Sequence, residues 1–225
     1  MNINLLHIET ATKSCSVAVS VNGQVKSVVE TISDGYIHGE KLTLFIEQAL
    51  EKAQLSTDDL HAVSLSSGPG SYTGLRIGCS TAKGICFAKN IPMIAINSLQ
   101  CIALATAKDF PSCHLVAMID ARRMEAFTQV FCGSVEPLSE IEATIFDENT
   151  FTEYEPFVAT GDGAKKLKEL WSQRNVIFAE KNYSTAESQA QTAYEKYLAK
   201  DFEDLAYFEP FYLKDFVAKK SKKEN

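Results

Sequence analysis

Residues 66–78 read Ser66-Ser67-Gly68-Pro69-Gly70-Ser71-Tyr72-Thr73-Gly74-Leu75-Arg76-Ile77-Gly78, and this glycine-rich segment joins an apolar strand pattern to a helical pattern. Its four glycines lie within eleven positions, and the last two fall inside the predicted helix. A glycine inside a helix costs about 1 kcal/mol relative to alanine. A tertiary contact or a ligand must therefore compensate for that cost.

A strand before and a helix after the segment would suit a phosphate-binding loop. Neither common motif fits, because a Walker loop needs Gly-Lys followed by Ser or Thr where this chain has Thr73-Gly74-Leu75. The dinucleotide fingerprint would place its third glycine at Thr73. We therefore interpret the segment as a structural loop, with Ser71 as the N-cap of the following helix. The loop comprises Gly68, Pro69, Gly70, Ser71, Tyr72, Thr73 and Arg76.

The elements around the segment alternate between strand and helix patterns. Asn22-Gly23 predicts a tight hairpin between the second and third strands. Apolar runs predict strands at 3–9, 14–21, 24–32, 61–66, 92–96, 114–120, 124–132, 135–146 and 157–160. Helical spacing predicts helices at 38–54, from the segment to about Lys89, and at 98–108, 164–173 and 184–199. We expect the lysine-rich end, Lys219 to Lys223, to be a frayed tail.

Two of these helices carry surfaces that suit another protein. On the helix over 38–54, Ile37 and Leu44 point away from the main apolar stripe, beside Lys41. An isolated exposed leucine is normal, so Leu44 has an alternative interpretation. On the next helix, small residues share one face and would let a partner helix approach closely. These residues are Gly74, Gly78, Thr81 and Ala82, with Ile85 beside them.

Composition excludes several classes of protein. The 225 residues are 45% hydrophobic and carry a net charge of −7, which argues against a protein that grips a nucleic-acid backbone unaided. The six cysteines show no Cys-x-x-Cys spacing and no secretory leader precedes them, so we expect free thiols in the cytoplasm. No apolar run is long enough to cross a bilayer.

A search for catalytic groups finds little. The four histidines are far apart, none at metal-binding spacing, and no Gly-x-Ser-x-Gly elbow occurs. Arg122 and Arg123 follow a predicted strand, where a strand end can open toward a ligand. A structural salt bridge with Asp120 or Glu125 is the favoured interpretation of these arginines, ahead of ligand binding.

The chain resembles the TsaB, or YeaZ, family. The resemblance rests on the opening Leu-Leu-His-Ile-Glu-Thr-Ala-Thr, the glycine-rich segment, Ala-Lys-Gly, Asn-Ser-Leu, Ile-Asp-Ala-Arg-Arg and a late Pro-Phe-Tyr-Leu-Lys. It implies an α/β, two-lobed fold of the actin, sugar-kinase and heat-shock ATPase type (ribonuclease H-like), with mixed sheets and flanking helices. We expect an N-terminal lobe over residues 1–108 and a smaller, degenerate lobe over 109–225.

The resemblance also implies a function. It indicates a non-catalytic scaffold or activating subunit for threonylcarbamoylation of the adenosine beside the anticodon, in tRNAs that read codons beginning with A. The implied partners are the catalytic paralogue TsaD and the ATPase TsaE, with a homodimer when the chain is alone, indirect contact with tRNA and no membrane. The alternatives are a small-molecule kinase or other phosphotransferase of the same fold, and a protease.

Site residues follow from the same resemblance. TsaD holds its metal with a His-x-x-x-His pair, and Ser98 and Ile102 occupy the matching positions here, so neither catalysis nor a metal is expected. No cofactor is expected to bind tightly, although ATP or ADP at the subunit interface would meet Thr10, Thr12, Gly161, Asp162 and Gly163. The implied partner-binding residues are Ile37, His38, Lys41, Leu44, Phe45, Gly74, Leu75, Gly78, Thr81, Ala82 and Ile85. On this hypothesis, Gly78→Trp should weaken partner binding and leave the monomer folded.

Overall fold

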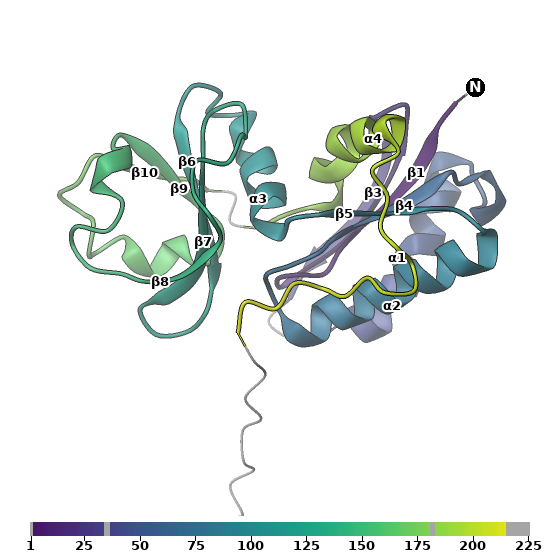
Figure 1. The fold of residues 1–225 in the computed structure, drawn as a ribbon, viewed down its shortest axis with the longest axis horizontal. Coiled ribbons are helices and arrows are strands. Elements are labelled where there is room, and N and C mark those ends of the chain that lie inside the picture. The colour runs from purple at the N-terminus through teal and green to yellow at the C-terminus, as the bar shows by residue number, and fades with distance from the viewer. Residues whose placement is uncertain (1, 34–36, 181–182, 215–225) are drawn as a thin grey trace, which may run out of the picture.

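The computed structural model describes residues 2–33, 37–180 and 183–214, so the predicted lysine-rich tail lies outside the described residues. The chain forms two lobes, each built on a five-stranded sheet (Figure 1). The first sheet has the order β3-β2-β1-β4-β5. Its strands are β1 (Asn4–Glu9), β2 (Ser14–Val21), β3 (Gln24–Ile32), β4 (Ala62–Ser66) and β5 (Met93–Ile96).

The second sheet repeats the topology of the first. Its order is β10-β9-β6-β7-β8, with strands β6 (His114–Asp120), β7 (Glu125–Phe131), β8 (Glu142–Ile145), β9 (Phe157–Thr160) and β10 (Val176–Phe178). In each sheet the first three strands in sequence form an antiparallel meander, and the other two pair parallel to it. The turn after β1 and the turn after β6 therefore occupy equivalent places in the two lobes.

Helices α1 (His38–Ala53) and α2 (Tyr72–Lys89) cover one face of the first sheet, and α4 (Ala190–Ala199) covers the other (Figure 1). Helix α3 (Ser98–Ala107) packs against the second sheet through Leu99 and Ile102, so it connects the lobes. The opposite face of that sheet packs around Trp171, which is fully buried. Among the described residues, no helix is long and apolar enough to cross a membrane.

A buried histidine on β1 is hydrogen-bonded to both neighbouring strands of the first sheet. His7 Nδ1 and Nε2 each lie 2.7 Å from a serine hydroxyl, those of Ser64 and Ser20. Gln189, just before α4, accepts a hydrogen bond from Ser64 Oγ and donates one to the Ile8 carbonyl oxygen. Burial lowers the pKa of His7 to about 3, so the ring is neutral near pH 7.

The second half of the chain differs from the sequence expectations in three places. The helix predicted over 164–173 is a short 3-10 turn at Ala164–Leu167, and the strand predicted over 135–146 is reduced to β8. Strand β10 was missed, because three residues between turns give too short a pattern.

The chain also returns to the first lobe, contrary to the assignment of residues 109–225 to the second. Helix α4 packs against β5 and β1, and Leu205 and Phe208 pack against the core between the first sheet and α1 and α2. We call residues 203–214 the C-terminal strap, which begins where Glu203 N donates to Met93 O and runs beside α2 (Figure 1). It ends at Lys214, whose ammonium group pairs with Glu125 of the second lobe.

Candidate functional site

The glycine-rich segment leads from β4 into α2 and packs against the turn after β1, α3 and the C-terminal strap. Ser71 is the N-cap of α2, as predicted, and its hydroxyl accepts a hydrogen bond from Gly74 N at 3.2 Å. Ser98 Oγ accepts from Gly68 N at 2.9 Å, and Phe211 N in the strap donates to Ser67 O at 2.7 Å. The segment therefore ties α3 and the strap to the first sheet.

Each glycine makes room for backbone or side chain of this same chain. A β-carbon at Gly70 would overlap the Ala11 carbonyl oxygen, and one at Gly74 would overlap that of Thr10. At Gly78 the overlap would be with Thr10 Oγ1. Gly68, at φ +109°, lies against the Phe211 carbonyl. The compensation for these glycines is close packing within the monomer.

Several residues expected to contact a partner are covered by this chain itself. Gly74, Leu75, Gly78 and Ala82 are buried inside the monomer, where they face the turn after β1 and the first sheet. His38 is buried too, and its Nε2 lies 3.0 Å from the Thr12 carbonyl oxygen. A tryptophan at Gly78 would disrupt the fold, because it would have to displace the turn after β1.

The turn after β1 is equally committed to the fold. Glu9 is fully buried, and its Oε1 accepts hydrogen bonds from Ala11 N at 2.7 Å and Ser66 Oγ at 2.9 Å. Ser71 N donates to Ala11 O at 2.6 Å, which clamps the turn to the segment. Burial raises the pKa of the Glu9 carboxyl. Thr10 and Thr12 are buried as well.

The turn after β9 carries the other residues expected to meet a nucleotide. Gly161, at φ +95°, packs against the Met118 carbonyl, and Asp162 Oδ1 accepts from Asp120 N at 2.8 Å. Burial raises the pKa of Asp162, and the negative charge of Asp120 raises it further. The positive charges of Lys13 and Lys166 act in the opposite direction and lower it.

Two backbone N–H groups, at the turn after β1 and at the start of α2, already have partners within the chain. The Ala11 N–H that could bind a phosphate already binds Glu9, and the Gly74 N–H at the start of α2 already binds Ser71. The space beside Gly70 and Gly74 is filled by the turn after β1. Within residues 2–33, 37–180 and 183–214, no group of three or more His, Cys, Asp or Glu could hold a metal ion.

The remaining helix surface is exposed and partly apolar. Leu44 is 47% exposed and Phe87 is 82% exposed, and space beside Gly84 is open to 4 Å. Sequence reasoning missed Phe87, because it placed the small-residue stripe on the buried side of α2, with Gly84 off that stripe as a possible second contact. We define the α1–α2 face by the exposed Lys41, Leu44, Gln48, Ser80, Gly84 and Phe87, with the half-buried Ile37, Phe45, Ile77, Thr81 and Ile85 at its base.

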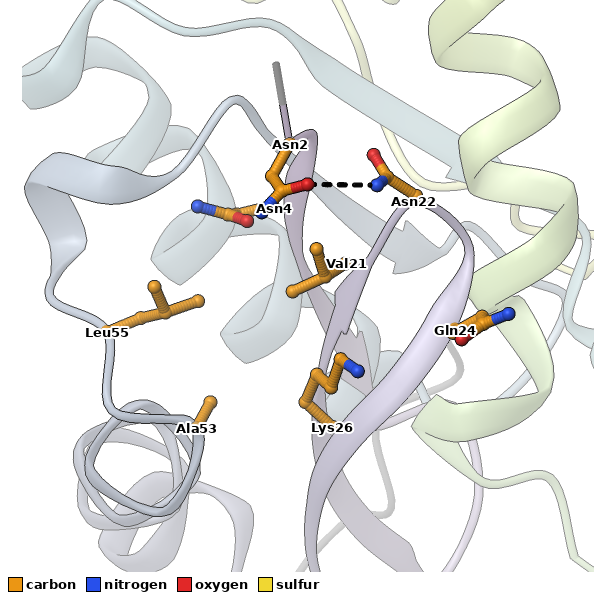
Figure 2. A pocket seen from close by; sticks show the side chains of 8 residues that line it. All are labelled: Asn2, Asn4, Val21, Asn22, Gln24, Lys26, Ala53 and Leu55. Carbon is orange, nitrogen blue, oxygen red and sulfur yellow. Dashed lines mark hydrogen bonds between the residues drawn. The ribbon is translucent and has the colours of Figure 1, made fainter.

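A cavity of about 470 Å³ lies at the opposite end of the first sheet. Figure 2 shows Asn2, Asn4 and Asn22 around its rim. These three side chains already take part in hydrogen bonds within the chain. Asn22 Nδ2 donates to Asn2 Oδ1, and Asn4 Nδ2 donates to Asp59 O. No residue predicted from the sequence to form a site lines this cavity.

Comparison with known proteins identifies the family. Residues 36–222 match the family model described as TsaD: tRNA N6-adenosine threonylcarbamoyltransferase. The chain is 33% identical over 130 residues to the tRNA threonylcarbamoyladenosine biosynthesis protein TsaB of Haemophilus influenzae, covering 57% of this chain and 54% of that protein. The chain belongs to the TsaB/YeaZ family. The match spans about half the length of this curated relative and of the TsaB of Escherichia coli, to which the chain is 31% identical over 53% of that protein's length.

The fold of the TsaB/YeaZ family extends over nearly the whole chain. YeaZ from Pseudomonas aeruginosa superposes with a TM-score of 0.82 at 22% identity, covering 94% of this chain and 100% of that chain. The two-lobed actin-like and sugar-kinase-like fold class expected from the sequence is thereby confirmed.

Proposed function

We propose that this chain is a non-catalytic docking subunit for threonylcarbamoylation of tRNA, and that the α1–α2 face binds a TsaD-type catalytic paralogue. The observation that carries the proposal is an exposed apolar surface on two adjacent helices of a TsaB/YeaZ-family chain. The chain would act in the cytoplasm, with TsaE as a further partner. The modified adenosine would lie beside the anticodon of tRNAs that read codons beginning with A.

The shape of the α1–α2 face supports binding to a helix. Phe87 projects into solvent, and Gly84, one turn earlier, leaves an open position next to it. Such a pair can insert a ring into a partner and receive a partner side chain in return. Burying a phenylalanine side chain contributes about 1.5–3 kcal/mol. A second copy of this chain would use the same face, so a homodimer would compete with the heterodimer.

Residues that correspond to the TsaD histidine pair support a role without catalysis. Ser98 is fully buried and its hydroxyl is bound to the backbone at Gly68. Ile102 lies in the core between α3 and the second sheet. Neither side chain could hold a metal ion at an exposed reaction centre. The filled turn after β1 argues in the same direction against a kinase.

Reconstitution tests the proposed function. A tRNA transcript would be incubated with threonine, bicarbonate, ATP, the threonylcarbamoyl-AMP synthase, TsaD and TsaE of one organism, with and without this chain. We expect modified adenosine, measured by mass spectrometry of nucleosides, only when this chain is present. Modification at the same rate without it would contradict the proposal. Modification by this chain without TsaD would show that it is itself the enzyme.

A further inference from the structure

The turn between β6 and β7 holds two arginines in an unfavourable backbone conformation. Arg122 and Arg123 have φ values of +72° and +50°, in the left-handed region. That region costs L-residues other than glycine roughly 1–2 kcal/mol each. The hairpin between β2 and β3 uses the favoured Asn22 and Gly23, at +52° and +76°. Chain reversal alone would not require arginines at positions 122 and 123.

Their expected acidic neighbours are bound to other groups. Asp120 pairs with Lys166, and its Oδ1 also accepts a hydrogen bond from Arg122 N. Glu125 pairs with Lys214 at the end of the strap. Both arginines are exposed, and neither side chain has a hydrogen-bond or ion-pair partner within the part of the chain that the structure describes. Two guanidinium groups are thus free to bind an anion.

The surroundings add positive charge in an otherwise acidic protein. Two lysines pair with carboxylates beside the turn, Lys166 with Asp120 and Lys214 with Glu125, and Asp162 lies next to Asp120. With the two arginines, four cations thus face three carboxylates, whereas the whole chain has a net charge of −7. The two ion pairs balance in charge, and the two arginines exceed the remaining carboxylate of Asp162.

We propose that the Arg122–Arg123 turn binds the phosphate backbone of an RNA. The choice of RNA rests on the proposed function, which brings a tRNA to the assembled subunits. An extended polyanion needs only exposed cations spaced along its backbone. This contact would be direct, in contrast to the indirect one expected from the sequence.

The experiment measures RNA affinity of the full chain in the absence of TsaD. A fluorescently labelled tRNA transcript would be titrated with the wild type and with Arg122→Gln/Arg123→Gln, by anisotropy at several salt concentrations. Each phosphate contact contributes about 0.7–0.9 to the slope of log affinity against log salt. We expect the double variant to lose about tenfold or more in affinity and to reduce the slope by about 1.4–1.8.

Two further variants separate charge from fold. Lys26→Gln/Lys108→Gln removes the same charge from exposed sites, one on β3 and one after α3 at the opposite end of β6, and should bind RNA as the wild type does. Arg122→Asn/Arg123→Gly should lose RNA affinity and melt about 2–4 °C higher, because it relieves the backbone.

Equal losses in both charge-removal variants would overturn the proposal, as would unchanged binding by Arg122→Gln/Arg123→Gln or no RNA binding by the wild type. Arginine-dependent binding of a polyglutamate peptide without RNA binding would replace RNA by an acidic protein segment. Failure of TsaD docking with retained arginine-dependent RNA binding would contradict the proposed function instead.

Discussion

At the scale of single residues, the glycines of the glycine-rich segment make room for the turn after β1. Thr10 and Ala11 lie where β-carbons of Gly70, Gly74 and Gly78 would otherwise be. Gly84 is a glycine of another kind, because nothing lies within 4 Å of the position that its β-carbon would take. A side chain added at Gly78 should therefore destabilise the fold, whereas one added at Gly84, in the same helix, should not.

Alanine substitutions distinguish these two kinds of glycine. We expect Gly78→Ala to lower the free energy of unfolding by about 1–3 kcal/mol, since the added methyl group overlaps Thr10 Oγ1. Gly84→Ala is the matched control and should raise it by about 1 kcal/mol through helix propensity. Urea denaturation measures both. Similar effects of the two substitutions would contradict the packing described for the segment.

Glu9 provides a prediction of pH dependence. Burial raises the pKa of this carboxyl above its ordinary value of 4.5, so the folded state binds its proton more tightly than the unfolded state. The contribution of Glu9 to stability is therefore lost as pH rises from 4.5 toward the folded-state pKa. Glu9→Gln keeps an acceptor for Ala11 N and avoids a buried charge. We expect its stability relative to the wild type to rise with pH.

Denaturation at several pH values between 5 and 8 tests this prediction. His7 has the opposite dependence, since burial lowers its pKa to about 3 and it destabilises the fold as pH falls below its ordinary value of 6.5. That contribution is the same in both proteins and cancels in their difference. If the difference in free energy of unfolding between wild type and Glu9→Gln stays constant with pH, the pKa of Glu9 is not raised in the folded protein.

At the scale of elements, the sequence predicts the first lobe better than the second. The Asn22-Gly23 hairpin, the helix beginning at His38 and the cap at Ser71 all follow from local chemistry, and the structure confirms them. The face of α2 that meets solvent could not be predicted in this way. Small residues occur on both sides of α2, and only tertiary packing shows that Gly78 is covered and Gly84 is open.

At the scale of the whole molecule, two lobes of equal topology are joined by α3 and the C-terminal strap. The strap could not be predicted, because an extended segment without periodicity gives no local signal and its contacts are distant in sequence. Phe211 packs against Gly68, and Lys214 reaches Glu125 in the other lobe. The turn after β1 covers the side of α2 that carries Gly74 and Gly78. The α1–α2 face is the side of these helices that remains available to a partner.

Isothermal titration calorimetry with the TsaD paralogue of the same organism tests that surface most directly. Gly84→Arg places a long side chain on the open position of α2 and should lower affinity by about tenfold or more, with the melting temperature within about 2 °C of the wild type. Ala199→Arg makes the same type of change at an exposed position of α4, across the sheet, and should bind normally. Wild-type affinity in Gly84→Arg would contradict docking through the α1–α2 face.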